Sequence, residues 1–329
     1  MTLNLSKPDA GAIGWASAVN LNWDSVEAEF DDLAGVKPGV AHGRLSLSST
    51  EPVPTSDQDA KTTLYYLPFK STKIALYAGA GQWTLEDIGS SGLSVSNGTL
   101  DTSTAKPYDV FLYLSGGSLT LELVAWSSDS ARSTALAQQD GALVKSGAPE
   151  RRYLGTIRSV IDGGAGKFQD SAAKRYVWNT ANRVCRHLVA RDTTSTWQYS
   201  SNSWRAARND TSEGVGRVGF VVGDPAGLPG HWEAVVKNVV GSTTLVRCAG
   251  GVGLDSTTVN LAQGSGTIVS AGGYNTDVAV CRSVVATPGY HYLQRLEISQ
   301  GNGGTTTWYG SDTFSGVTLD SCLLASLSM

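Results

Sequence analysis

The chain has 329 residues and a formal net charge of −4, and 16% of its residues are charged, against about 25% in an average soluble domain. It contains 38 glycines, and glycine, serine and threonine are typical of short strands joined by tight turns. This composition argues against a helical enzyme, whose exposed helix faces usually carry many charged side chains. The N-terminus lacks the regions of a signal peptide, and the most apolar stretch, 110–126, is interrupted by SGGS and contains Glu122. We therefore expect neither export nor membrane insertion.

Residues 1–42 are expected to form an association helix followed by a linker. Apolar residues in this segment are spaced 4, 3, 4, 3, as in a coiled-coil seam, and Gly35 and Pro38 indicate the end of the helix. An isolated helix of this length is marginal in water, so it needs copies of itself or another protein as a partner. The alternative is an amphipathic helix that packs on its own domain. The seam consists of Val19, Trp23, Val26, Phe30 and Leu33.

Residues 43–208 are predicted to form a β-rich middle domain, because short apolar or alternating runs are bounded there by turn residues. The stretch 110–126 predicts two strands joined at a Gly-Gly turn, and Asn97-Gly98 indicates a tight hairpin turn. One helix is expected over 170–184, packed on the sheets. Its apolar side consists of Ala173, Tyr176, Val177, Thr180, Ala181 and Val184.

The block 151–208 is the basic part of the chain, with eleven basic and three acidic residues and a net charge of +8. Such a block can indicate a nucleic-acid surface. We favour a solvated face or a contact with another subunit, because the chain is acidic and no nucleic-acid-binding motif accompanies the block. No nucleic-acid partner is expected.

Residues 209–329 are predicted to form a C-terminal β-sandwich, because eight candidate strands are separated by glycine-rich turns. The fold class expected for the whole chain is therefore mainly β, with a jelly-roll-like sandwich at its C-terminal end. The eight candidates are 217–223, 231–241, 243–251, 267–274, 276–286, 290–298, 305–310 and 319–329.

The sequence singles out no catalytic, cofactor-binding or metal-binding residues, and no cofactor is expected. Its four histidines lie in none of the familiar catalytic motifs, although an unrecognised carboxylate pair of a polysaccharide-cleaving enzyme stays an alternative. In the strand 290–298, alternation places Tyr290 and Leu296 on the face expected to pack inward. His291, Leu293 and Arg295 share the other face, which we expect to contact neighbouring chains.

Four cysteines occur, and none belongs to a CxxC motif or a zinc-finger spacing. We expect four free thiols, with disulfides formed after release from the cell as the alternative. The four are Cys185, Cys248, Cys281 and Cys322.

Several stretches resemble tailed-bacteriophage virion proteins, namely tail fibres, minor tail proteins and head fibres. GAIGWASAVNLNWDSVEAEF resembles their short N-terminal helix, KPYDVFLYLSGGSLTLELVAW and DSAAKRYVWNTANRV resemble a domain common among them, and PGYHYLQRLEISQGNGGTTTWYG is similar to their C-terminal sandwich. The resemblance implies a virion structural protein without catalysis. It implies a homotrimer attached to the tail or capsid by its N-terminus, with its C-terminus pointing outward.

From this resemblance we expect the protein on the virion surface, after synthesis in the host bacterial cytoplasm. The tip would bind a host cell-surface glycan or protein, and Trp308, Tyr309 and Tyr274 are the candidate receptor-binding residues, unless they are core aromatics. Two alternatives stay open. One is a capsid-decorating, cement or head-fibre protein that stabilises the particle. The other is a tailspike-type polysaccharide-degrading enzyme.

Overall fold

The chain is mainly β in the part that the computed structural model describes. Helical segments in that part are two short 3-10 helices, η1 (Asn97–Thr99) and η2 (Ala207–Asn209). The expected fold class is confirmed at this level, whereas the seam from Val19 to Leu33 lies outside the described residues. The described ranges are 38–227, 233–261, 267–269, 274–282, 287–300, 305–314 and 317–329.

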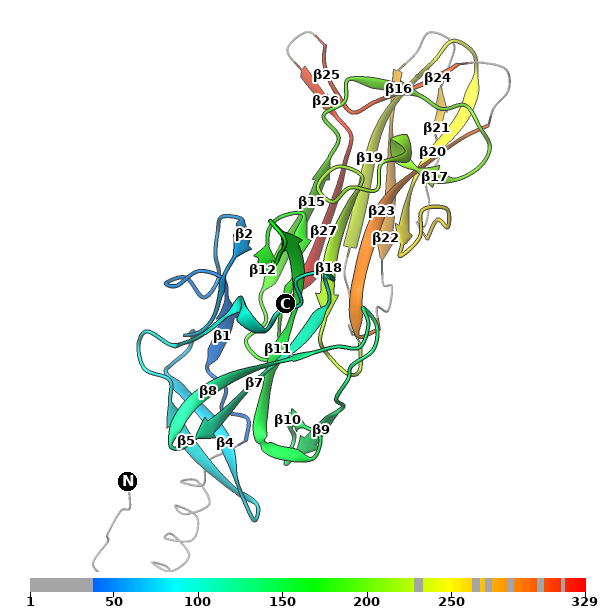
Figure 1. Ribbon diagram of the computed structural model, residues 1–329. Coiled ribbons are helices and arrows are strands. Elements are labelled where there is room, and N and C mark those ends of the chain that lie inside the picture. Colours follow the sequence, from blue (N-terminus) through cyan, green and yellow to red (C-terminus); the bar gives the residue numbers. More distant parts are fainter. Residues whose placement is uncertain are drawn as a thin grey trace, which may run out of the picture.

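The first of two β bodies, the proximal body, is built around the long strand β11 (Ala148–Asp162) (Figure 1). This strand pairs antiparallel with β7 on one edge and with β10, β12 and β14 at successive points along its length. Its core is an apolar cluster in which Leu64, Val110 and Phe168 are almost fully buried. The other strands are β1 (Gly43–Ser46), β2 (Gln58–Lys61), β3 (Thr63–Pro68), β4 (Lys73–Gly79), β5 (Gln82–Asp87), β6 (Leu93–Ser96), β7 (Pro107–Ser115), β8 (Ser118–Ala125), β9 (Leu136–Gln139), β10 (Ala142–Lys145), β12 (Ala165–Asp170) and β14 (Val177–Asn179).

One of the two predicted turns is confirmed and the other is wrong. Strands β7 and β8 form the expected hairpin, and its turn residues Gly116 and Gly117 have φ of 56° and 83°, a region that favours glycine. At Asn97 the chain instead enters η1. The preceding strand β6 pairs antiparallel with β3, which comes earlier in the chain, and not with a strand that follows Asn97. The Asn97 side chain donates a hydrogen bond to the Gly166 carbonyl at 2.6 Å, so it fastens η1 to β12 and does not shape a hairpin.

The helix predicted over 170–184 is wrong, because this segment forms short strands. β13 (Lys174–Arg175) pairs parallel with residues 219–220, and β14 pairs antiparallel with residues 155–157 of β11. Residues 175–179 are all buried, since sheets cover both of their faces. A strand buried on all sides has no alternation of apolar and polar residues. The spacing of the apolar residues in 170–184 therefore matched a helix by chance.

The second body, the distal sandwich, consists of two six-stranded sheets that enclose a main apolar core and a smaller one around Trp308. Phe220 and Leu293 from one sheet and Leu323 from the other are fully buried in the main core. All eight strands predicted in the C-terminal region are present. Besides β13, the strands of the two sheets are β15 (Cys185–Arg191), β16 (Thr196–Gln198), β17 (Arg205–Ala206), β18 (Arg217–Val222), β19 (Glu233–Ser242), β20 (Val246–Leu254), β21 (Thr267–Val269), β22 (Tyr274–Arg282), β23 (Gly289–Ser299), β24 (Thr306–Tyr309) and β27 (Cys322–Ser328). Strands β25 (Ser311–Phe314) and β26 (Val317–Asp320) form a separate two-stranded sheet.

The sheets divide the chain earlier than the boundary predicted at residue 208. Strand β15 pairs with β27 along its whole length, β16 pairs with β24, and β17 pairs with β23. Residues 185–206 therefore belong to the distal sandwich. The sequence does not show this, because these pairings join distant segments, such as Leu188 with Ala325 and Arg205 with Glu297.

The two bodies lie end to end and are joined by a packed junction (Figure 1). Trp178 of β14 is 1% exposed and belongs to the core of the distal sandwich. The carbonyl of Gly223 accepts hydrogen bonds from Tyr153 Oη at 2.8 Å and from Arg132 Nη2 at 2.6 Å. The C-terminal Met329 is 1% exposed in the same core. The C-terminal residue therefore lies near the junction and not at the end of the sandwich remote from the proximal body (Figure 1).

The arginines of the basic block lie mostly in ion pairs within the monomer. Arg158 binds Asp129 at 3.1 Å, and Arg175 and Arg186 both bind the buried Asp170. This pairing neutralises part of the local charge of +8. Of the expected free thiols, Cys185 is exposed and Cys322 is buried, and neither is in a disulfide.

Candidate functional site

A cluster of buried polar and charged residues surrounds β23, the strand in which the sequence placed His291, Leu293 and Arg295. Strand β23 is central in its sheet, between β18 and β20. His291 is 7% exposed, and Leu293 and Arg295 are 0% exposed. The expected contact of these residues with neighbouring chains is therefore wrong: their face lies inside the sandwich, while Tyr290 and Tyr292 on the opposite face are only partly buried.

Glu297 is the anchor of this interior. Its carboxylate is 0% exposed and accepts a hydrogen bond from Trp197 Nε1 at 2.7 Å. It also accepts hydrogen bonds from Arg205 Nε at 2.8 Å and from the backbone N–H of Arg208 at 3.0 Å. These donors come from β16, β17 and η2, so one carboxylate holds three successive parts of the 192–216 segment against β23.

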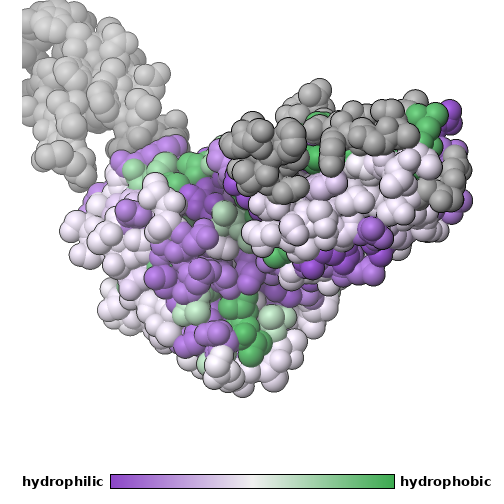
Figure 2. Space-filling model, turned by 90° about the horizontal axis from the view of Figure 1, so that it is seen from above, coloured by the Kyte–Doolittle hydropathy of each residue, from purple (hydrophilic) through white to green (hydrophobic). Residues whose placement is uncertain are grey.

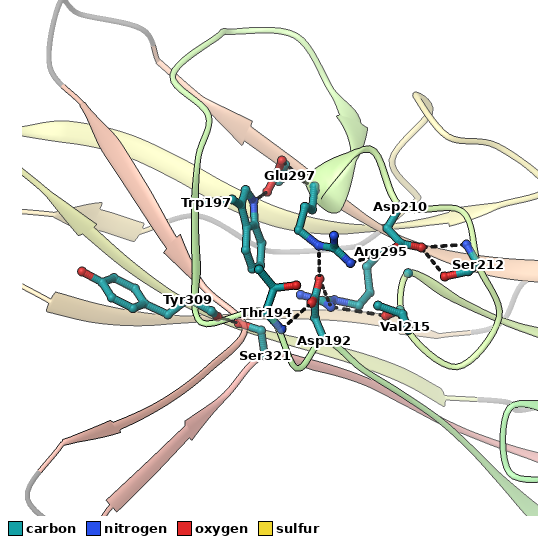
Figure 3. Close-up of polar contacts among 12 residues, drawn as sticks. Asp192, Thr194, Trp197, Asp210, Ser212, Val215, Arg295, Glu297, Tyr309 and Ser321 are labelled. Carbon is teal, nitrogen blue, oxygen red and sulfur yellow. Dashed lines mark hydrogen bonds and ion pairs between the residues drawn. The ribbon is translucent and has the colours of Figure 1, made fainter.

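A second buried carboxylate, Asp192, completes the network, which is shown in Figure 3. Arg208 Nε donates to Asp192 Oδ2 at 3.0 Å, and Arg208 Nη2 donates to Asp210 Oδ2 at 2.5 Å. Arg295 Nη1 lies 3.8 Å from the same Asp192 oxygen. We call Asp192, Arg205, Arg208, Asp210, Arg295 and Glu297, together with Trp197, the loop anchor.

Two features of the loop anchor are energetically unfavourable, namely a left-handed backbone conformation at Arg208 and the burial of two charges. Arg208 has φ of 58°, a conformation that a non-glycine side chain adopts only when surrounding contacts impose it. Burial lowers the pKa of Arg295 and raises that of Glu297, because each charge has been removed from water. Arg295 Nε and Nη2 have no hydrogen-bond partner among the described residues.

His291 is buried and pairs with Asp255, whose side chain is 41% exposed, and both of its ring nitrogens are hydrogen-bonded. Nδ1 donates to Asp255 Oδ2 at 2.6 Å and Nε2 donates to the Thr287 carbonyl at 2.7 Å. Both partners are acceptors, so the ring carries both protons. Burial lowers the pKa of His291, but the hydrogen bond and charge of Asp255 outweigh it, and the net shift is upward. Through the hydrogen bond to Asp255 the histidine fastens the 255–259 loop to β23.

The candidate receptor-binding aromatics differ in their placement. Trp308 is 0% exposed, packs on Val240 and Val246, and donates Nε1–H to the Tyr199 carbonyl at 3.1 Å. It is a core residue, so its prediction as a surface contact is wrong. Tyr309 is half-buried in β24. Tyr274 begins β22, and its side chain lies outside the description.

The loop anchor fixes the position of the 192–216 segment. Its two buried carboxylates, Asp192 and Glu297, are each occupied by arginine and backbone donors. They hold the 192–216 segment in one conformation on the sandwich. The sequence showed Arg295 and Glu297 two positions apart in an apolar strand, which was the available signal for a buried charge. Asp192 had no such signal, because its partners come from distant segments.

In the described part of the chain, no group of histidine, cysteine, aspartate and glutamate side chains is placed to hold a metal ion. No helix among the described residues is long and apolar enough to cross a membrane.

Comparison with known proteins gives no family for this chain: no family model and no curated protein matches it. Among solved structures, it is similar to a glycoside hydrolase family 43 arabinoxylan arabinofuranohydrolase from Bacillus subtilis, with 12% identity and a TM-score of 0.19 over 83% of this chain and 53% of that chain. The Cry4Aa toxin from Bacillus thuringiensis has 6% identity and a TM-score of 0.20 over 84% of this chain and 50% of that one.

A structure of the Gx strain of infectious bursal disease virus has 10% identity and a TM-score of 0.20, over 89% of this chain and 73% of that chain. The chain spans about half the length of the first two proteins. Similarity at these TM-scores carries no argument about fold or function.

Proposed function

We propose that the protein is a fibre-like structural component of a bacteriophage virion, attached through its N-terminal region and binding the host surface with its distal sandwich. The observation that supports this most is the end-to-end arrangement of two β bodies, with the first described residues in the body remote from the sandwich tip (Figure 1). Finer parts of the proposal are a trimer formed by the N-terminal helix and a jelly-roll-like topology of the sandwich.

The direction of β19 defines the tip. This strand begins beside Ser326, near the buried C-terminus, and runs away from the junction to Ser242. Its ten residues span about 33 Å at the usual rise of a strand. The turn 243–245 that follows therefore lies at the end of the sandwich furthest from the proximal body. This end, and not the C-terminus, is the part of the fold that would meet a host cell.

The junction supports a rigid connection between the two bodies. Thr156 Oγ1 and Arg132 Nε both donate to the buried Asp109, at 2.6 and 2.8 Å. Tyr153 Oη and Arg132 Nη2 reach across to the Gly223 carbonyl. A connection fixed by buried, charge-assisted hydrogen bonds keeps the tip at a constant distance from the attachment end. A spacer that presents a binding surface needs this property.

Nine large apolar side chains are exposed among the described residues, and the most exposed of them lies at the tip. Figure 2 shows a mainly hydrophilic to intermediate face on which apolar residues form small patches. Leu245, in the turn after β19, is 64% exposed. An exposed leucine gains free energy when a partner covers it, at about 25 cal/mol per Å² of apolar surface. We therefore assign first contact to the turn 243–245, in place of Trp308.

Adsorption inhibition tests this proposal. Purified protein is added to host cells before phage, and the fraction of adsorbed phage is measured. Wild-type protein should compete for the receptor, and Leu245→Ser should weaken competition severalfold without a change in thermal stability. Leu85→Ser is the matched control, because Leu85 is 46% exposed but lies on β5 of the proximal body. Equal competition by both variants would refute the tip assignment.

A trimer would multiply weak tip contacts through avidity. Sedimentation equilibrium of the full-length chain should give three times the mass of one chain, and a monomer would contradict the trimer. A capsid-decorating protein is separated from a fibre by the same adsorption assay. Particles that lack such a protein would lose heat stability while adsorbing to host cells normally.

A further inference from the structure

A cavity of about 330 Å³ lies where the two bodies meet. The linker at Pro38–Gly43, strand β3, the turn between β9 and β10, and strand β11 contribute its walls from the proximal body. The segment 224–226, which follows β18 of the distal sandwich, closes another side. Its volume is at the lower end of the range for small-molecule sites. It is separate from the loop anchor and from the tip.

One wall of the cavity is formed by Arg152, a buried cation without a carboxylate partner. Its residue is 6% exposed, and Nη1 donates to the Ala75 carbonyl at 2.7 Å. The guanidinium lies 5.7 Å from the Trp83 ring. None of the described carboxylates is within ion-pair distance of it. A buried charge without a counter-ion is strongly unfavourable unless an anion reaches it.

The neighbouring Arg151, in contrast to Arg152, has a carboxylate partner. Arg151 lies on the opposite face of β11 and binds Glu122 at 2.7 Å, and its side chain is 26% exposed. Arg152 lies deeper than Arg151, yet it has the weaker set of partners. Burial lowers the pKa of Arg152 to about 10, so the guanidinium is still charged at neutral pH.

A hydroxyl donor stands beside this cation in the same cavity. Tyr66 is 2% exposed and also lines the wall. Burial raises its pKa to about 12, although the charge of Arg152 opposes the shift, so the phenol is neutral and can donate. The Tyr66 ring lies so close to Gly43 that an added Cβ there would be 2.4 Å from Cζ. Glycine at this position therefore allows the ring to occupy the cavity wall.

We propose that this cavity binds a small molecule bearing a single carboxylate, of the size of an acidic monosaccharide, with the carboxylate placed on Arg152 and Tyr66. The planar guanidinium matches a carboxylate, which it can bind through two parallel hydrogen bonds. Asp224 also lines the cavity, with Arg183 at 3.8 Å from its carboxylate, and its negative charge opposes a dianion such as phosphate more than a monoanion. The proposal does not depend on the fibre function, because the cavity is remote from the tip.

Isothermal titration with D-glucuronate as the probe tests the site, and D-glucose serves as the neutral matched sugar. Wild-type protein should bind glucuronate saturably and glucose at least about tenfold more weakly, as expected for the loss of a charge-assisted hydrogen bond. No saturable glucuronate binding would overturn the proposal. Inorganic phosphate bound as tightly as glucuronate would overturn the assignment to a carboxylate.

Two variants and a control locate the binding. Arg152→Met should lower glucuronate affinity at least about tenfold, and it should fold, because it removes an uncompensated buried charge. Ala226→Trp should obstruct the cavity while Arg152 stays in place, since Ala226 is exposed and lines the rim. Arg151→Met, the control, should bind as wild type does. Unchanged binding in either cavity variant, or an equal loss in the control, would contradict the site.

Discussion

Replacing Glu297 by glutamine tests whether the loop anchor determines the structure of the distal sandwich. The substitution keeps the size of the side chain but removes the charge that pairs with Arg205. It also turns an amide N–H₂ group toward donors, namely Trp197 Nε1 or the Arg205 and Arg208 groups, at distances of 2.7 to 3.0 Å. At least one buried donor then loses its acceptor.

The expected loss of stability follows from burial. Removing one partner of a buried ion pair costs about 3–5 kcal/mol. The Glu297 side chain is 0% exposed but that of Arg205 is 24% exposed, and Arg205 can therefore regain some water. We expect about 3 kcal/mol, at the lower end of that range, which is roughly a hundredfold change in the folding equilibrium.

Urea unfolding, followed by circular dichroism at a fixed protein concentration, measures this loss. Glu122→Gln is the matched control, because Glu122 also binds two cations, Lys145 at 3.0 Å and Arg151 at 2.7 Å, but its side chain is 26% exposed. The control should lose less, about 1 kcal/mol, because all three of its partly exposed side chains can regain water. Hydrogen exchange should accelerate in residues 192–216 for Glu297→Gln alone. Equal losses in the two variants would refute the idea that Glu297 anchors this segment.

Three further predictions concern Trp308, Gly43 and His291. Trp308→Ala should lower the free energy of unfolding by about 3–5 kcal/mol. A urea midpoint equal to that of the wild type would contradict the burial of Trp308. Gly43→Ala should cost about 1–3 kcal/mol through overpacking on Tyr66, measured in the same way. The folded pKa of His291 is raised above its usual 6.5, so its stabilising contribution is complete below that pH and is lost as pH rises through the folded pKa. Melting temperatures across this range should fall less steeply for Asp255→Asn than for wild type.

The sequence predicted the parts of the fold that depend on local patterns. Eight strands of the C-terminal region and the hairpin at 110–126 were predictable, because apolar runs there are bounded by turn residues. Gly116 and Gly117 supply a turn that few other residues allow. Strand existence could be predicted from such patterns, but strand partners could not.

The errors arose where long-range packing determines the local structure. Residues 175–179 are buried on all sides by both bodies, so their order of apolar and polar residues carries no period. Arg295 was assigned to a face that contacts neighbouring chains, and charged residues such as Arg295 and Glu297 are rarely buried without partners. Their partners Asp192 and Arg205 lie about a hundred residues away in the chain, and only the folded sandwich brings them together.

The same reasoning explains why the candidate sites changed. Trp308 in a glycine- and threonine-rich stretch looked exposed, but β24 is flanked by β16 and β19, and its tryptophan completes their core. The sequence did not distinguish Arg152 as a binding residue, since it follows Arg151 within a basic block. The two differ because alternation along β11 places one arginine on each face, and one of these faces is buried.

Electron cryomicroscopy of intact phage particles, with an antibody fragment against the turn 243–245 as a marker, tests the central claim most directly. The account predicts fibre-like density on the particle surface, with the proximal body at the attachment point and the marker at the outer end. Absence of the chain from purified particles, or a marker buried against the capsid or tail surface, would contradict it.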